Sequence, residues 1–189
     1  MTASPVQAIL RRPLPLFMAA MLLLTPVLMS VAVPDAHAAD ASNPSLVATH
    51  GKWSVYTFME KGHPVCYMLS QPKKSRGNYT RRGDIYALVT DRPADGSKDV
   101  FSYIAGYPYK PGSNVTLDVD RKHFTLFTQD DTAWAPDAAT DAKIASAIRH
   151  GSDMVVKGTS SHGTNTVDTF SLKGSGDSYN AMIKTCAGK

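Results

Sequence analysis

The chain has 189 residues, of which 43% are hydrophobic and 19% charged, and its formal net charge is +4 at pH 7. This length suffices for one domain with a core of its own, even after loss of a signal peptide. So small a positive charge is not the footprint of a nucleic-acid-binding protein, and we expect no nucleic-acid partner.

Residues 1–38 have the features of a cleaved signal peptide. Two arginines precede an apolar run from Leu14 to Val33, and Ala36-His37-Ala38 places small residues at the two positions that a signal peptidase reads. A membrane-spanning anchor is the alternative, but two prolines interrupt the run. We therefore expect cleavage after Ala38, no transmembrane span in the mature chain, and a periplasmic, envelope-associated or secreted protein.

Residues 39–51 are small and polar, and we expect them to form a flexible leader to a domain over residues 52–189. Within that domain, short segments alternate with period two between glycines, prolines and aspartates, which is typical of half-buried antiparallel strands. Such segments are centred on residues 53–58, 65–70, 85–89, 100–104, 115–119, 124–126, 154–159 and 165–172. About eight strands in a chain of this length predict a β-sandwich.

Two helices interrupt the strand pattern. Between Asp141 and His150 two isoleucines stand four residues apart, and Gly151 is suited to close the helix in the left-handed conformation. Between Asp177 and Cys186 apolar side chains repeat with the i, i+3, i+4, i+7 spacing of a buried helix face. The predicted fold class is therefore all-β, an antiparallel β-sandwich with two short helices.

The stretch KGTSSHGTNTVDTFSLKG, residues 157–174, raises the question of catalysis. Its first glycines have the spacing of a phosphate-binding loop, but Thr164-Asn165 stands where that loop needs lysine and a hydroxyl residue. Ser161, His162 and Asp168 supply the residue types of a hydrolase triad. Neighbours on a tight turn point in different directions, however, and no strand–turn–helix elbow is present. We predict a hairpin and no catalytic residue, and keep a periplasmic hydrolase as the alternative.

The candidates for metal binding are equally weak. The six histidines are scattered, with no pair at ligand spacing. The aspartates Asp118, Asp120, Asp130 and Asp131 fit solvated hairpin turns better than a calcium site. We expect neither a metal nor a cofactor.

The strongest surface signal is a run of five cations within ten residues, namely Lys73, Lys74, Arg76, Arg81 and Arg82. One interpretation is a loop between two strands that charge keeps solvated. The other is docking on an anionic surface, whether phospholipid headgroups, lipopolysaccharide phosphates or an acidic protein. Tyr107 and Tyr109 form a second candidate binding surface for sugar or protein contacts, with packing over a sheet end as the alternative.

Cys66 and Cys186 are predicted to form a disulfide. Both lie on segments expected to face the core, they are the only thiols, and the expected compartment is oxidising. The bond would tie the last helix to a strand near the start of the domain.

Several short pieces carry a family resemblance by their order and spacing between residues 52 and 186. They are Trp53-Ser54-Val55, Cys66, Gly106-Tyr107-Pro108, Asp120 with Phe124, Ala133-Trp134, residues 151–160, residues 163–172, and Cys186. In these pieces the chain resembles the invasion-associated locus B proteins of Gram-negative bacteria. Members commonly carry an arginine where His162 stands.

The resemblance implies a periplasmic or envelope-associated β-sandwich that is immunoglobulin-like in architecture. It implies no activity and no catalytic residue, and its link to invasion and virulence is a name without a mechanism. We therefore expect an exported, non-enzymatic protein that binds an envelope protein, a host-surface protein or an anionic lipid or lipopolysaccharide surface.

Overall fold

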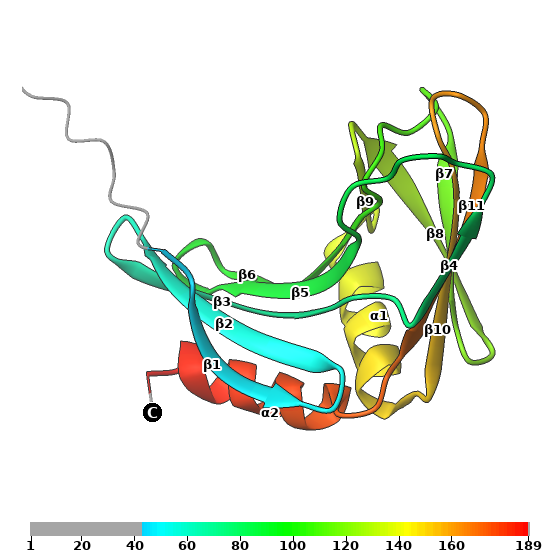
Figure 1. Ribbon diagram of the computed structural model, residues 1–189. Coiled ribbons are helices and arrows are strands. Elements are labelled where there is room, and N and C mark those ends of the chain that lie inside the picture. The colour runs from blue at the N-terminus through cyan, green and yellow to red at the C-terminus, as the bar shows by residue number, and fades with distance from the viewer. Residues whose placement is uncertain (1–42, 189) are drawn as a thin grey trace, which may run out of the picture. The chain divides into compact units, whose positions relative to one another are not determined.

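The computed structural model describes residues 43–188, which form a mainly antiparallel β-structure with two α-helices (Figure 1). The first six strands are β1 (Ser45–His50), β2 (Trp53–Glu60), β3 (His63–Ser70), β4 (Lys74–Gly77), β5 (Tyr86–Arg92) and β6 (Ser97–Ile104). The other five are β7 (Asn114–Val119), β8 (Lys122–Gln129), β9 (Thr132–Trp134), β10 (Asp153–Thr159) and β11 (Asn165–Ser171). The helices are α1 (Ala138–His150) and α2 (Ser175–Cys186), and a 3-10 turn, η1, spans Pro93–Asp95.

The predicted signal peptide, residues 1–38, lies outside the described residues. Among residues 43–188, no helix is long and apolar enough to span a bilayer. Part of the expected leader is ordered, because β1 pairs with β2 from Ser45 opposite Thr57 to His50 opposite Trp53. The prediction of a flexible leader is therefore wrong for residues 45–50. Leu46, Val47 and Ala48 follow one another in this segment, so it lacks the period-two alternation that predicts a strand.

Hydrogen bonds join the strands into one sheet in the order β1-β2-β3-β5-β6-β9-β8-β7-β10-β11-β4. Strands far apart in this order nevertheless meet. The indole Nε1 of Trp53 in β2 donates to the carbonyl oxygen of Ser171 in β11 at 3.0 Å. The rings of Tyr103 in β6 and Phe170 in β11 meet edge to face, with centroids 6.2 Å apart. Opposite parts of the sheet therefore enclose a common core, as a β-sandwich does, but this strand order does not confirm an immunoglobulin-like arrangement.

The predicted alternation within the strands is confirmed. Alternate side chains are buried in the core along β2, β3, β5, β7 and β10, namely Trp53 and Val55, Cys66 and Met68, Ala87 and Val89, Val115, Leu117 and Val119, and Met154 and Val156. Helix α2 packs on β1, β2 and β3, whereas α1 packs on β6 and touches β7 and β8 (Figure 1). The two helices thus cover apolar strand faces that would otherwise meet water.

Both predicted helices form, but α1 ends differently from the expectation. The Asp137 carboxylate caps its first turn by accepting from the Thr140 amide at 2.7 Å. Gly151 follows its last turn with φ −90° and ψ 176°, which is extended, so the predicted left-handed cap is wrong. The Asp120 carboxylate instead accepts from the amide of Ser152 at 3.1 Å. That bond holds the backbone immediately before β10.

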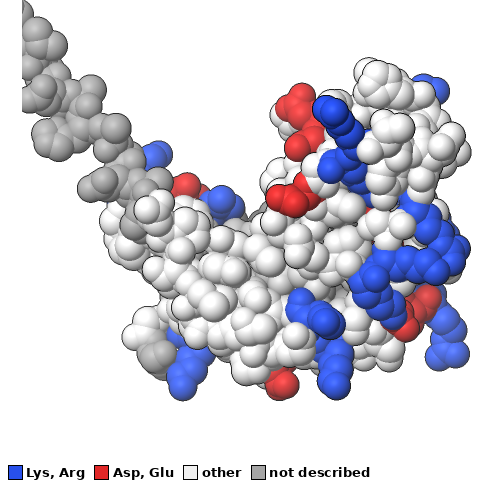
Figure 2. Space-filling model, viewed as in Figure 1, with Lys and Arg blue, Asp and Glu red and all other residues white. Residues whose placement is uncertain are grey.

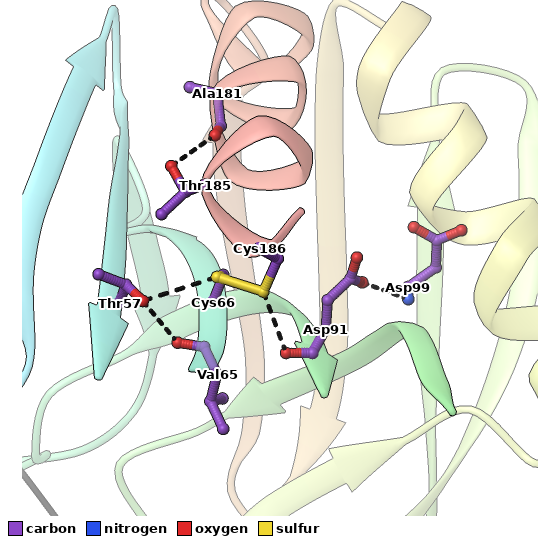
Figure 3. The surroundings of a disulfide bond; sticks show 8 residues. All are labelled: Thr57, Val65, Cys66, Asp91, Asp99, Ala181, Thr185 and Cys186. Atoms are coloured by element: carbon purple, nitrogen blue, oxygen red, sulfur yellow. Dashed lines mark hydrogen bonds between the residues drawn. A yellow bond between two sulfur atoms is a disulfide. The ribbon is translucent and has the colours of Figure 1, made fainter. Parts of the chain in front are cut away.

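The predicted disulfide between Cys66 and Cys186 is confirmed (Figure 3). It joins β3 to the last residue of α2 across a sequence separation of 120, with Cα atoms 5.7 Å apart. The hydroxyl of Thr57 lies 3.6 Å from the Cys66 sulfur, and the carbonyl oxygen of Asp91 lies 3.8 Å from the Cys186 sulfur. The bond therefore anchors α2 to the sheet that it covers.

Candidate functional site

The five cations of the basic run do not share one environment. Residues 74–77 are not loop but the edge strand β4, which pairs antiparallel with β11 so that Lys74 lies opposite Thr169 and Arg76 opposite Val167. The chain then continues irregularly to β5. Arg82, within this irregular part, turns inward, whereas the other four cations are exposed.

Arg82 forms a buried ion pair with Asp168 of β11. Only 4% of the Arg82 side chain and 0% of the Asp168 side chain are exposed. Two guanidinium nitrogens donate to the two carboxylate oxygens, Nη1 at 2.9 Å and Nη2 at 2.7 Å, and Nε donates to the Ala105 carbonyl at 2.7 Å. Such a two-pronged arrangement satisfies both charges. The prediction that Arg82 belongs to an exposed binding surface is therefore wrong.

The Tyr103 hydroxyl completes this cluster. It donates to the Asp168 carboxylate and accepts from Arg82 Nη2 at 3.1 Å. Burial, followed by the charge of Asp168, raises the pKa of Tyr103. Burial alone lowers the pKa of Arg82, but its hydrogen bond to Asp168 and the neighbouring charges outweigh burial, and the net direction is upward. Arg82 therefore stays charged and Tyr103 stays neutral.

The tyrosines of the second predicted surface differ in exposure, although their rings meet edge to face with centroids 5.3 Å apart. Tyr109 is buried, and burial followed by the neighbouring Tyr107 raises its pKa. It therefore offers no exposed binding surface, and packing at the sheet end is the correct interpretation for this residue. Tyr107 is half-buried, and its hydroxyl is 2.6 Å from that of Thr166 in β11.

Four exposed cations, which we call the basic edge, remain as a surface: Lys73, Lys74, Arg76 and Arg81. Lys73 forms an exposed ion pair with Asp153, which screening by water makes weak. No ion pair of Lys74, Arg76 or Arg81 occurs within the part of the chain that the structure describes. Figure 2 shows lysine and arginine side chains gathered where β4 lies in Figure 1.

A polar pocket of about 470 Å³ opens beside the basic edge. Its nine lining residues come from the irregular segment after β4, from the connection between β6 and β7, and from the β10–β11 hairpin. They include Tyr79, Arg81, Tyr107, His162 and Thr166. Two other hollows are larger, at about 620 Å³ near β2 and β3 and about 580 Å³ between β8 and α1, but neither adjoins the buried ion pair.

The predicted aspartate turns serve structural purposes. Asp118 accepts from Lys157 at 2.9 Å and bonds His123 at 2.6 Å, and Asp120 holds the backbone after α1. Among the described residues, no group of histidines, cysteines and acids could hold a metal ion.

Comparison with known proteins assigns the chain to a family. The sequence profile described as "Invasion associated locus B (IalB) protein" matches residues 53–183. The chain belongs to this family. Its fold is also similar to that in the crystal structure of invasion associated protein B from Bartonella henselae, with a TM-score of 0.54. The two chains are 20% identical, and the match covers 75% of this chain and 98% of the other. No curated protein sequence matches the chain.

Within this member of the invasion associated locus B family, the hydrolase arrangement is not formed. The hairpin predicted from residues 154–172 is confirmed as β10 and β11, with Ser161 and His162 exposed in its turn. Both carboxylate oxygens of Asp168 are bound by Arg82, and one also by Tyr103. No hydrogen bond joins Ser161, His162 and Asp168 to one another within residues 43–188.

The sequence analysis did not predict the ion pair between Arg82 and Asp168. Asp168 was considered only beside its neighbour His162, and Arg82 only beside the other cations. Alternation along the strand was the available signal, because Thr166, Asp168 and Phe170 share one face of β11 and all are buried. A buried aspartate requires a partner, and arginine is the usual one.

Proposed function

We propose that this protein is an exported, non-catalytic protein of the cell envelope that docks on an anionic membrane surface through its basic edge. Export is supported by the signal-peptide features of residues 1–38 and by the disulfide, since such bonds persist in oxidising compartments. Membership of the invasion associated locus B family is compatible with this role, and the engagement of both Asp168 carboxylate oxygens by Arg82 favours it over the hydrolase alternative.

The observation that carries the proposal is the unneutralised charge of the basic edge. Lys74 and Arg76 are exposed on a terminal strand of the sheet, and Arg81 is exposed just beyond it. None of the three is paired with a carboxylate in the described part of the chain. Cations near an anionic bilayer contribute about 1 kcal/mol each, so these side chains and Lys73 could together hold the protein at the surface.

The buried ion pair supports this surface indirectly. Arg82 is held by Asp168 and by the Ala105 carbonyl, which fixes the segment immediately after Arg81. Arg82 itself cannot contribute to docking, because its charge is neutralised inside the protein. The docking surface is thus smaller than the run of five cations suggests.

The proposal is tested by binding of the exported protein to vesicles that contain anionic lipid. Attraction between exposed charges is screened over about 8 Å at physiological ionic strength. Binding should therefore weaken as salt is added, and it should be absent with vesicles of zwitterionic lipid alone. Equal binding to both kinds of vesicle would contradict the proposal.

A further inference from the structure

The polar pocket beside the basic edge has a charge pattern that favours an anion. All nine lining residues belong to the described chain, and none is acidic. Asp168 lies behind the pocket, and Arg82 neutralises it. Arg81 reaches the pocket as an exposed cation without a partner among residues 43–188, and His162 adds a further hydrogen-bonding ring.

Two aromatic rings of the pocket are held in place from behind. The Arg82 guanidinium lies over both, 4.8 Å from the centroid of Tyr107 and 5.4 Å from that of Tyr79. Glycines provide the space for these rings. A Cβ atom on Gly77 would lie 2.8 Å from the Tyr79 ring, and one on Gly158 would lie 3.1 Å from the Tyr107 hydroxyl. Both rings therefore have defined contacts within the protein itself.

Hydroxyl groups are the remaining element of the pocket. Thr166 bonds the Tyr107 hydroxyl at 2.6 Å, and Ser160 accepts from the Thr164 amide at 3.2 Å. These bonds orient side chains that retain further capacity as donors or acceptors. A cleft of a few hundred Å³ with aromatic walls and a few placed polar groups is typical of a small-molecule site.

We propose that this pocket binds a small anionic saccharide, a sugar that carries a carboxylate or a phosphate group. The C–H face of the sugar would pack on Tyr79, whose ring is partly exposed, because tyrosine combines an apolar body with a polar tip. The sugar hydroxyls would bond the threonine, serine and asparagine groups. The acidic group would face Arg81, whose planar guanidinium suits both carboxylate and phosphate.

Two simpler ligands fit less well. Inorganic phosphate would leave the tyrosine rings and most of the pocket unused. A neutral sugar would leave the Arg81 charge without a partner. The inference goes beyond docking on a membrane. The two proposals share Arg81, but the pocket otherwise uses Tyr79, Tyr107 and His162. Docking otherwise uses Lys73, Lys74 and Arg76, so the two can fail separately.

The test is a titration of the exported, disulfide-bonded protein, followed residue by residue by NMR chemical shifts. The probes are glucuronate, glucose 6-phosphate, glucose and inorganic phosphate. At least one of the two acidic sugars should bind about tenfold more tightly than either glucose or phosphate. A charge-assisted bond supplies roughly that difference relative to glucose, and the ring and hydroxyl contacts supply it relative to phosphate. The shifts should concentrate at Tyr79, Arg81 and Tyr107. The tighter of the two acidic sugars shows whether the pocket prefers a carboxylate or a phosphate group.

Two arginines provide matched variants. Arg81→Gln should weaken binding of the acidic sugar about tenfold and reduce the affinity for glucose much less. Arg76→Gln removes a neighbouring exposed charge that does not line the pocket, and it should have little effect. Tyr79→Ala should weaken the binding of both the acidic sugars and glucose.

Three results would overturn the inference. The first is that neither acidic sugar binds more tightly than glucose and phosphate. The second is that Arg76→Gln weakens binding as much as Arg81→Gln, which would indicate diffuse attraction to the surface. The third is that the shifts fall outside the pocket. If the protein binds an acidic sugar in the pocket but does not bind anionic vesicles, only the proposed function is refuted.

Discussion

Arg82 and Asp168 stand 86 residues apart in the sequence and form a two-pronged ion pair in the interior. Through it, the irregular segment after β4 is bound to β11, and the Tyr103 hydroxyl and the Ala105 carbonyl tie the same guanidinium to β6 and the residue that follows it. One side chain of the basic run therefore organises the interior, while its immediate neighbour Arg81 faces solvent. Replacing Arg82 should therefore affect the stability of the fold far more than replacing Arg81.

Removal of one partner of this pair should destabilise the fold severely. Arg82→Met leaves the Asp168 carboxylate buried and uncompensated, which typically costs about 3–5 kcal/mol. The measurement is the free energy of unfolding from urea denaturation with the disulfide intact. Arg81→Met serves as the control and should change it by no more than about 0.5 kcal/mol. Equal values for the two variants would refute the assigned role of Arg82.

The double variant Arg82→Met with Asp168→Leu sharpens this test. Replacing both charges by apolar groups avoids an unpaired buried charge, so it should cost much less than the sum of the single replacements. An additive result would show that the two side chains do not interact.

Two buried tyrosines should respond in opposite directions to loss of the hydroxyl group. The Tyr109 hydroxyl is buried and has no hydrogen-bond partner among the described residues. Tyr109→Phe should therefore leave stability unchanged or increase it, since an unsatisfied buried polar group costs about 1–3 kcal/mol. Tyr103→Phe removes a bond to Asp168 and should be destabilising. Thermal unfolding of the two variants gives the comparison, and a lower Tm for Tyr109→Phe than for Tyr103→Phe would be inconsistent with these contacts.

The pH dependence of stability should reveal the buried carboxyl of Asp141. This group accepts from the Phe101 amide at 2.8 Å, and burial raises its pKa above the ordinary 3.8. The folded state therefore binds this proton more readily than the unfolded chain, so the contribution of Asp141 to stability falls as the pH rises above 3.8. The stability of Asp141→Asn relative to the wild type should increase over the same range and then level off.

Asp137 provides the control of opposite sign. Its pKa is lowered by hydrogen bonds to Thr140, so its contribution to stability is present above the ordinary value of 3.8 and is lost as the pH falls through the lowered pKa. Asp137→Asn should accordingly lose stability relative to the wild type as the pH rises. Curves of the same sign for the Asp137 and Asp141 variants would contradict one of the two assignments.

The disulfide should account for a large share of the stability. Cys66 and Cys186 close a loop with a sequence separation of 120, for which the chain-entropy treatment gives about 4–5 kcal/mol. Replacing both cysteines by alanine should lower the free energy of unfolding by roughly that amount. Thiol titration of the denatured, unreduced wild-type protein should detect no free thiol. Two reactive thiols would show that the bond is not formed in the protein.

Strands and helices were largely predictable because their signals are local. The period-two pattern at Trp53 and Val55 and the helical spacing up to Cys186 each depend on neighbouring residues and on a common core. The disulfide was predictable because only two cysteines exist. Strand β1 was not, because its apolar residues Leu46, Val47 and Ala48 are consecutive and give no period-two alternation.

The site could be predicted only in part. Local charge density identified residues 73–82, but it could not separate Arg82 from Arg81, because adjacent residues in an irregular segment have no fixed periodicity. The distinction depends on Asp168, which β11 brings to the same place from 86 residues away. The same limitation placed Tyr107 and Tyr109 together, although the structure buries one and leaves the other partly exposed.

Salt-dependent binding to anionic vesicles tests the central claim most directly. The disulfide-bonded wild-type protein is compared with a triple variant in which Lys73, Lys74 and Arg76 become glutamate. These residues are exposed and the variant retains Arg82, so its unfolding transition should stay close to that of the wild type. The account predicts wild-type binding that declines steeply with salt and no detectable binding of the variant, since cations at such a surface contribute about 1 kcal/mol each. Equal binding of the two proteins, or no wild-type binding at low salt, would contradict the account and leave the cations as a charged edge that only blocks strand addition.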